Sequence, residues 1–244
     1  MLVIAIETAT MAGSIAIVDD ARVISEITLN IRATHSEKLM PAIDRLLGDS
    51  GLAIDDMDGV AVSIGPGSFT GLRIGLSAAK GLSYASGKPL IGIPTLDALA
   101  LNMTFSSYLI CPIQDARKGE VYTALYGPGD NSPGKISDDI AVNPDALEGM
   151  ITEKTVFLGD GVNRYRDLLM AKLGGLYYEA PLPLQLPRAS NVALLALNRL
   201  EKGDTDDPFT MIPRYIRKSE AEIRCGENRG RPLKGACQEK KELH

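Results

Sequence analysis

The stretch from residue 60 to residue 86 constrains the fold more than any other part of the chain. Its first five residues, VAVSI, alternate between branched apolar and small side chains, which is the pattern of a buried strand. Glycines and a proline follow at once and prevent that strand from continuing. Helix-forming residues then predominate, and either Ser68 or Thr70 can cap the helix. The sequence therefore predicts a strand, a tight turn and a helix in direct succession.

Small residues follow one face of this predicted helix. Gly75, Ala78, Ala79 and Leu82 recur at steps of three and four residues, so another element can approach the face closely. Two interpretations follow from this pattern. The helix either packs tightly on the chain's own sheet or presents the face to a partner subunit.

A glycine-rich turn before a helix also suggests a phosphate-binding loop, because free amides and the positive end of the helix attract anions. The spacing excludes both common forms of that loop. Gly71 is followed by Leu72 and Arg73, where a P-loop requires lysine and then serine or threonine. Thr70 stands where a dinucleotide-binding turn requires glycine.

The composition indicates a globular protein that can bury a sizeable core. The chain has 244 residues, of which 45% are hydrophobic, enough for one large domain or two small ones. No apolar run reaches the roughly 18 residues of a membrane span, and the first residues resemble a strand and not a signal peptide. Cys111, Cys225 and Cys237 lack the spacing of a disulfide framework or a zinc site. We therefore expect a cytoplasmic protein whose cysteines are structural or incidental.

The net charge of −5 bears on nucleic-acid binding. Affinity for RNA depends largely on neutralised phosphates, so an acidic chain without a basic stripe is expected to bind RNA weakly by itself. Residues 223–244 are polar and carry six basic residues against three glutamates. We expect this segment to be a disordered tail, and the alternative is a basic arm that touches RNA.

The order of the predicted elements indicates a mixed α/β sheet. Three strands within residues 2–29 precede a helix with a capping box at Thr34 and Glu37, and strands and helices then alternate. An antiparallel meander followed by alternating elements is the order of the ribonuclease-H-like fold. A fainter copy of the opening pattern begins at residue 108, which predicts lobes at residues 1–102 and 103–222, the second one reduced.

Residues 65–76, GPGSFTGLRIGL, and residues 79–82, AKGL, resemble the signature of the TsaB (YeaZ) family. This family provides the non-catalytic subunit of the bacterial machinery that makes threonylcarbamoyladenosine in tRNA. The resemblance covers at least residues 1–222. It implies kinship with the catalytic subunit TsaD, with the glycoprotease-like M22 group and with actin-like ATPases. The expected fold is therefore the two-lobed actin-like ATPase fold, in which the ribonuclease-H-like unit is duplicated.

The resemblance also implies how the chain works. It is expected to bind and activate TsaD through a bundle made by its helices at residues 34–47 and 72–86, with the ATPase TsaE as a further partner. Alone it is expected to form a homodimer, and to meet tRNA only through the complex. The residues assigned to the contact are Leu39, Ile43, Leu46, Leu47, Leu72, Gly75, Ala78, Ala79 and Leu82. The substitutions Gly75→Leu and Ala79→Arg are predicted to break this contact and leave a folded monomer.

Catalytic groups are scarce in this sequence. His35 and His244 are the only histidines, which excludes paired imidazole ligation of a metal. By resemblance, Thr95 and Leu99 stand where TsaD has its metal-binding histidines. The nucleophile motif G-x-S-x-G does not occur, and Asp115, followed by two basic residues, is interpreted as part of a solvated turn. We therefore predict no metal site and no catalytic residues.

A nucleotide site is harder to exclude from the sequence. The resemblance points to a vestigial site formed by the first strand–turn–strand and by a loop in the second lobe, with a glutamate where the family pattern has aspartate. Its residues would be Glu7, Thr8, Thr10, Gly159, Asp160 and Gly161. No intrinsic cofactor is expected, although ATP or ADP could bind at the subunit interface. The competing hypotheses are a glycoprotease-like peptidase, a nucleotide-binding actin-like enzyme, an RNA-binding module and a stand-alone structural dimer.

Overall fold

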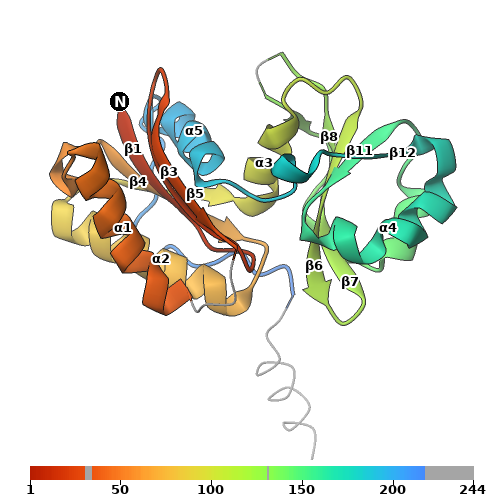
Figure 1. Cartoon of the computed structure of the whole chain (residues 1–244), viewed down its shortest axis with the longest axis horizontal. Helices are drawn as coiled ribbons and strands as arrows, with labels where there is room; N and C mark the ends of the chain where they lie inside the picture. Colours follow the sequence, from red (N-terminus) through yellow and green to blue (C-terminus); the bar gives the residue numbers. More distant parts are fainter. Residues whose placement is uncertain (31–34, 131, 218–244) are drawn as a thin grey trace, which may run out of the picture.

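The computed structural model describes residues 1–30, 35–130 and 132–217, and it has two lobes, each built on a mixed sheet (Figure 1). The elements of the first lobe follow the predicted order of a three-stranded meander, a helix, and then alternating strands and helices. They are β1 (Leu2–Glu7), β2 (Gly13–Asp19), β3 (Val23–Leu29), α1 (His35–Ser50), β4 (Gly59–Gly65), α2 (Phe69–Ser86) and β5 (Leu90–Pro94).

β1 lies at the centre of the first sheet, whose strand order is β3-β2-β1-β4-β5. β2 runs antiparallel to β1 and β3, whereas β4 runs parallel to β1 and β5. Residues 3–7 are buried because helices cover both faces of the sheet. α1 and α2 cover one face, and α5 (Ala189–Leu200) covers the other. The prediction of a mixed sheet with helices on its faces is confirmed.

The second lobe repeats the connectivity of the first. Its strand order, β10-β7-β6-β11-β12, combines antiparallel β7 with parallel β11 and β12 in the same way. It is also reduced, because a 3-10 turn at Pro144–Gly149 stands where the first lobe has α1. The elements are β6 (Leu109–Arg117), β7 (Glu120–Thr123), β8 (Tyr126–Gly127), β9 (Gly134–Lys135), β10 (Ile140–Val142), β11 (Thr155–Leu158), α4 (Asp160–Leu173) and β12 (Tyr177–Glu179).

Two helices cross between the lobes. Each packs on the lobe that does not contain the strand preceding it. α3 (Thr95–Ala100) follows β5, and its Leu96 and Leu99 join the core on the second sheet with Ile110. α5 follows β12 and packs on the first sheet. The predicted range of the second lobe, residues 103–222, therefore includes a helix of the first lobe's core. The sequence could not reveal this, because an apolar helix stripe fits either sheet.

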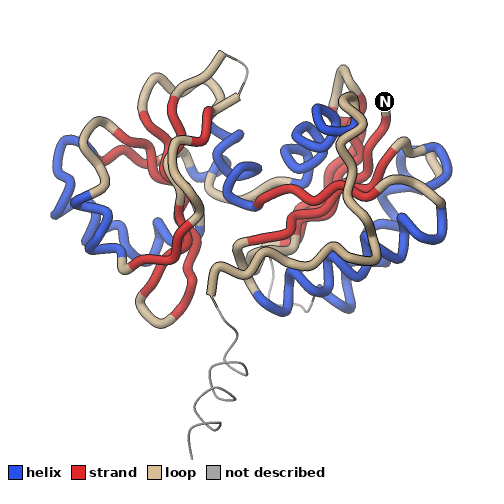
Figure 2. Tube along the Cα trace, turned by 180° about the vertical axis from the view of Figure 1, so that it is seen from behind, coloured by secondary structure: helices blue, strands red, loops and turns tan. Residues whose placement is uncertain are grey.

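The segment after α5, residues 204–217, forms a C-terminal strap that returns across the first lobe (Figure 2). The Asp206 amide donates to the Leu90 carbonyl oxygen at 2.8 Å, and the Arg214 amide donates to the Ile64 oxygen at 2.6 Å. The Arg214 guanidinium also reaches Asp139 of the second lobe at 2.9 Å. The strap therefore connects the two lobes.

The predicted strand–turn–helix is present, and the structure decides its cap. Ser68 precedes α2 and accepts a hydrogen bond from the Gly71 amide at 3.2 Å, while Gly87 ends the helix with a φ of 68°. The Thr34 half of the predicted capping box and the predicted tail at residues 223–244 lie outside the described residues. None of the helices in the described ranges combines the length and apolar character that a bilayer crossing requires.

Candidate functional site

The small-residue face of α2 packs against the turn that follows β1. A Cβ atom added at Gly71 would lie 2.1 Å from the Thr8 carbonyl oxygen, and one added at Gly75 would lie 2.2 Å from Thr8 Oγ1. Ala79, one turn further along this face, is fully buried. Of the two interpretations that the sequence allowed for this face, tight packing within the chain is the one that fits Gly75 and Ala79.

Hydrogen bonds tie the same turn to the start of α2. Thr8 Oγ1 donates to the Gly71 carbonyl oxygen at 2.9 Å, and the Ser68 amide donates to the Ala9 oxygen at 2.6 Å. Thr8 and Thr10 are both buried. Of the residues predicted as the first half of a vestigial nucleotide site, Thr8 is therefore packed against the chain's own helix, and its hydroxyl bonds to that helix.

Glu7 ends β1 and is fully buried beneath this turn. Its Oε1 atom accepts a hydrogen bond from the Ala9 amide at 2.6 Å, whereas Oε2 makes no hydrogen bond of standard geometry. Burial raises the pKa of Glu7 to about 7, and the Ala9 amide and the Ser63 hydroxyl lower it by less. Because burial in the folded chain moves this pKa away from the ordinary value of 4.5, the ionisation of Glu7 is coupled to folding.

The residues predicted as the second half of the nucleotide site, Gly159, Asp160 and Gly161, make structural contacts within the chain. The Gly159 amide donates to Gln185 Oε1 at 2.8 Å, and Asp160 Oδ1 accepts a hydrogen bond from the Asp115 amide at 3.0 Å. A Cβ atom at Gly161 would lie 2.9 Å from the Ile113 oxygen. Burial raises the pKa of Asp160, although the hydrogen bond from Asp115 opposes this. These contacts hold the start of α4 against β6.

The residue ranges that the structure describes contain no group of three or more histidine, cysteine, aspartate and glutamate side chains that could hold a metal ion. Thr95 and Leu99, at the positions of the TsaD histidines, are buried in α3. Leu99 belongs to the core on the second sheet. The side chain of His35 and the whole of His244 lie outside the described residues.

Most residues predicted for the partner contact lie in the chain's own core. The buried ones are Leu39, Ile43, Leu46, Leu72, Gly75 and Ala79. The partly exposed ones are Leu47, Ala78 and Leu82. The physical reason is that an apolar or small stripe marks a packed helix face without saying which element covers it. Gly75→Leu and Ala79→Arg are therefore expected to disturb the fold, contrary to the sequence-based prediction of a folded monomer.

α2 has a second small-residue face, which points away from the sheet. A Cβ atom added at Gly81 would meet nothing within 4 Å. On the neighbouring α1, Met40 is 48% exposed. We define the outer face of α2 as the exposed Ser77, Gly81 and Ala85. This face is open to a partner, and the sequence did not separate it from the buried one because small residues occur on both faces of the helix.

An aromatic cluster at the start of α2 was not predicted. The Phe69 and Tyr215 rings stack with their centroids 4.5 Å apart, and the Arg73 guanidinium lies 3.9 Å from the Phe69 centroid. Arg73 Nε also donates to the Tyr215 hydroxyl at 2.9 Å. The cluster fastens the C-terminal strap to α2. The only sequence signal was that Tyr215 lies in the last segment of the family resemblance.

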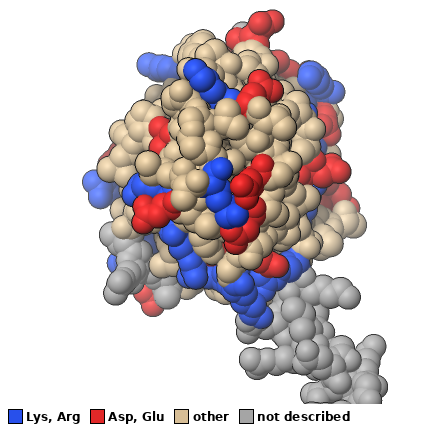
Figure 3. Space-filling view, turned by 90° about the vertical axis from the view of Figure 1, so that its right-hand side faces the viewer, with Lys and Arg blue, Asp and Glu red and all other residues tan. Residues whose placement is uncertain are grey.

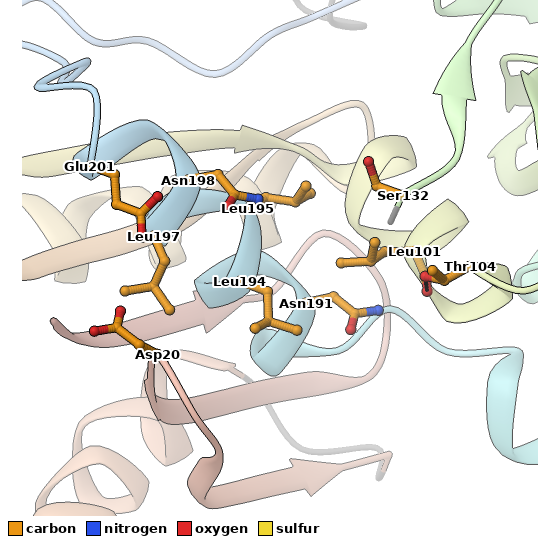
Figure 4. Close-up of a pocket in the computed structure, with 10 residues that line it drawn as sticks. All are labelled: Asp20, Leu101, Thr104, Ser132, Asn191, Leu194, Leu195, Leu197, Asn198 and Glu201. Carbon is orange, nitrogen blue, oxygen red and sulfur yellow. Dashed lines mark hydrogen bonds between the residues drawn. The ribbon is translucent and has the colours of Figure 1, made fainter. Parts of the chain in front are cut away.

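A pocket of about 340 Å³ lies beside α5, and its lining side chains come from α5, the end of α3 and two loops (Figure 4). Asn191, which lines it, donates from Nδ2 to the Ala98 oxygen at 2.9 Å and to Asn102 Oδ1 at 2.7 Å. Leu194 is partly open to solvent there. The polar contacts of Asn191 thus join α5 to α3, a structural role that the sequence did not indicate.

Fold and site together define a two-lobed α/β protein of actin-like architecture, in which helix α2 packs directly against the turn after β1. The family model described as TsaD, tRNA N6-adenosine threonylcarbamoyltransferase, matches residues 22–225. The chain is 33% identical over 228 residues to the tRNA threonylcarbamoyladenosine biosynthesis protein TsaB of Bacillus subtilis, covering 92% of this chain and 97% of the relative.

The TsaB protein of Escherichia coli is 32% identical over 228 residues, covering 91% of this chain and 96% of the relative. A solved Pseudomonas aeruginosa protein, described as similar to peptidase YeaZ, has a TM-score of 0.76 at 24% identity, covering 88% of this chain and 99% of that one. The chain belongs to the TsaB (YeaZ) family.

Proposed function

We propose that this chain is a non-catalytic subunit of the machinery that makes threonylcarbamoyladenosine at adenosine 37 of ANN-decoding tRNA. It acts by binding and activating a TsaD-type catalytic subunit. Family membership supports the pathway. The non-catalytic role is supported by the turn after β1, where Thr8 and Glu7 bond to the chain itself.

The observation that carries the proposed contact is the outer face of α2. Gly81 is exposed there with open space around it, and the neighbouring positions along the face have small side chains. A helix of a partner can approach such a face to a short interaxial distance. Met40 of the neighbouring helix α1 is a further exposed apolar side chain, and exposed apolar side chains are typical anchors of protein interfaces.

A single substitution tests this contact. Gly81→Arg places a long charged side chain on the outer face, and it is expected to leave the fold intact because arginine is a better helix former than glycine. Gly149→Arg is the matched control, since Gly149 is also exposed with nothing within 4 Å but lies in the second lobe. Each variant is mixed with the TsaD of the same organism and passed through size exclusion.

We expect Gly81→Arg to lose co-elution with TsaD and to lose support of tRNA modification, while Gly149→Arg keeps both. If Gly81→Arg co-elutes and supports modification as the wild type does, the outer face of α2 is not the contact. Modification by this chain without TsaD would contradict the non-catalytic role itself.

The further partners are proposed on the same basis. Without TsaD, the outer face of α2 can pair with its copy, because a two-fold contact requires only a self-complementary patch. TsaE joins the assembled pair, and tRNA binds only to the complex. A nucleotide, if one binds, lies between the subunits. Isothermal titration of the isolated chain with ATP and Mg²⁺ tests the last point, and micromolar binding with turnover would favour the competing enzyme hypothesis.

A further inference from the structure

The C-terminal strap and the other connections between the lobes lie at different levels of the molecule. The chain passes from the first lobe to the second through α3 and returns just before α5, and Figure 1 shows both crossings above the point where the strap ends. Figure 2 shows the same arrangement from behind. Two lobes that are joined on one side can rotate about that side, and a connection on the other side limits the rotation. The strap lies where such a connection would act.

The strap is bound firmly to the first lobe. Besides the backbone hydrogen bonds of Asp206 and Arg214, the Asp206 carboxylate accepts a hydrogen bond from the Gly92 amide at 2.8 Å. Met211 packs against the core between the first sheet and its helices α1 and α2. The strap also lies tightly on the end of β4, since a Cβ atom added at Gly65 would lie 2.7 Å from the Arg214 carbonyl oxygen. The strap therefore moves with the first lobe.

Two arginines hold the strap to the second lobe. The Arg214 guanidinium lies 2.9 Å from Asp139 Oδ2, and the Arg217 guanidinium lies 2.6 Å from Glu120 Oε2. Arg217 also donates to the Ala116 carbonyl oxygen at 3.3 Å. Both ion pairs join side chains, so they can break without any change in the backbone of either lobe.

Asp139 makes the first of these pairs depend strictly on distance. Its side chain is fully buried, and neither carboxylate oxygen accepts a hydrogen bond of standard geometry, so its charge is balanced by the ion pairs with Arg214 and Lys135. Lys135 is shared, because its Nζ also donates to Asp97 Oδ1 at 2.8 Å. Withdrawal of Arg214 would leave one cation for two carboxylates, and a buried charge without its partner is strongly unfavourable. The pair is therefore either formed or, once water reaches Asp139, fully released.

The second pair reaches a rigid part of the second lobe. Glu120 follows the turn of the β6–β7 hairpin, which consists of Lys118 and Gly119. Their φ values of 55° and 80° are typical of a tight type I′ turn, and Arg117 before them also has a positive φ, of 64°. The backbone that carries Glu120 is thus closely constrained.

The base of the same hairpin is fixed as well. The Asp115 amide donates to Asp160 Oδ1 at the start of α4 at 3.0 Å, and the Asp115 side chain pairs with Arg164 at 3.0 Å. That side chain is only 14% exposed, so Asp115 is not simply part of a solvated turn, as the sequence suggested. The hairpin therefore moves with the second lobe.

We propose that the strap is a latch that fixes the angle between the two lobes through the ion pairs Arg214–Asp139 and Arg217–Glu120. While both pairs are formed, the lobes are closed on the side of the strap. Salt screens the partly exposed Arg217–Glu120 pair, and substitution of the two arginines removes both pairs, so either change lets the lobes open. The inference does not rest on the proposed function, because every contact lies within this chain.

Single-molecule FRET measures the opening on the full chain without TsaD. The dyes are attached through Asp44→Cys on α1 and Ala171→Cys on α4, two exposed positions on helices at the far sides of the two lobes (Figure 1). The chain also carries Cys225→Ser and Cys237→Ser, while Cys111 is buried and stays unlabelled. The picomolar concentration keeps self-association from changing the signal.

Two latch variants are compared with the wild type. The first combines Arg214→Gln with Arg217→Gln and removes both cations. The second adds Asp139→Asn, so that no buried carboxylate is left without its cation and the fold keeps its stability. Circular dichroism shows that each variant is folded.

The control variant loses two arginines whose ion pairs each lie within one lobe. Acidic and basic side chains are interleaved on the outer side of the second lobe, which supplies pairs of this kind (Figure 3). Arg22→Gln with Arg166→Gln removes the pairs with Asp19 in the first lobe and with Glu179 in the second.

At about 0.1 M KCl we expect one narrow distribution of transfer efficiency for the wild type and for the control. Both latch variants should gain a population of lower efficiency, because opening on the side of the strap separates α1 from α4. Their ratio of open to closed molecules should exceed that of the wild type about tenfold, as expected when a charged group loses its partner. About 1 M KCl should shift part of the wild-type molecules in the same direction.

Latch variants whose distributions match that of the wild type would overturn the inference, and so would an equal shift in the control. If the first latch variant does not fold, the variant with Asp139→Asn decides. If neither folds, the salt series of the wild type decides, and a distribution that is the same at both salt concentrations would count against the latch.

Discussion

The buried carboxyl group of Glu7 makes stability depend on pH in a way that one substitution can remove. Glu7→Gln keeps the size and shape of the side chain, keeps an oxygen to accept the Ala9 amide, and has no proton to lose. In the wild type the burial of this group penalises the charged form, and the pKa rises from 4.5 to about 7. The substitution should therefore stabilise the protein only at pH values where the carboxyl group of the unfolded wild-type chain is ionised.

The magnitude follows from the two pKa values. Below pH 4.5 the group is protonated in both the folded and the unfolded chain, and it has no effect on the free energy of unfolding. Between pH 4.5 and about 7 the unfolded chain ionises first, so the wild type loses stability as the pH rises. At 1.36 kcal/mol for each pKa unit, the loss reaches about 3 kcal/mol above pH 7 and then stays constant.

Differential scanning calorimetry at pH 4.5 and pH 8 provides the assay. Glu7→Gln should match the wild type at the lower pH and raise Tm by about 6–12 °C at the higher one, since 1 kcal/mol corresponds to about 2–4 °C in a chain of this size. Glu153→Gln, at an exposed glutamate, is the control and should shift neither. A Tm difference that is the same at both pH values, or a variant that is less stable at pH 8, would refute the reasoning.

Three further outcomes are expected. Gly75→Ala should lower the free energy of unfolding by about 1–3 kcal/mol, because the new Cβ atom would lie 2.2 Å from Thr8 Oγ1. Gly81→Ala on the same helix should raise it by up to about 1 kcal/mol, because the new Cβ atom meets nothing within 4 Å and alanine is the better helix former. Urea titration measures both changes. Asp206→Ala removes hydrogen bonds that hold the strap to the first lobe, and should cost about 1–3 kcal/mol and speed proteolysis of the strap. The Cys111 thiol, whose pKa burial raises to about 12, should react with iodoacetamide only after unfolding; rapid labelling of its peptide in the native protein would contradict this.

The local elements of this protein could be predicted from the sequence with few errors. The alternation of residues 60–64 and the glycines after them specify the strand–turn–helix, because both signals depend only on neighbours along the chain. The duplication was also detectable, since the same order of strands produces the same sheet connectivity twice. The candidate interface was less well predicted. Leu39 lies on an apolar stripe and Gly75 on a small-residue stripe, and a helix has such a stripe whether the element packed on it belongs to the same chain or to a partner.

The sequence by itself determined the strands, the helices, the family and the scarcity of histidine, since each is a property of residue types and their spacing. The tertiary structure alone decided which helix packs on which sheet and which helix faces stay exposed. It placed α5 on the first sheet, pressed Gly71 and Gly75 against Thr8, left Gly81 open, and held Arg117 and Lys118 in a strained turn. These outcomes depend on contacts between residues that are distant along the chain, and the periodicity of a helix or strand carries no information about its neighbour.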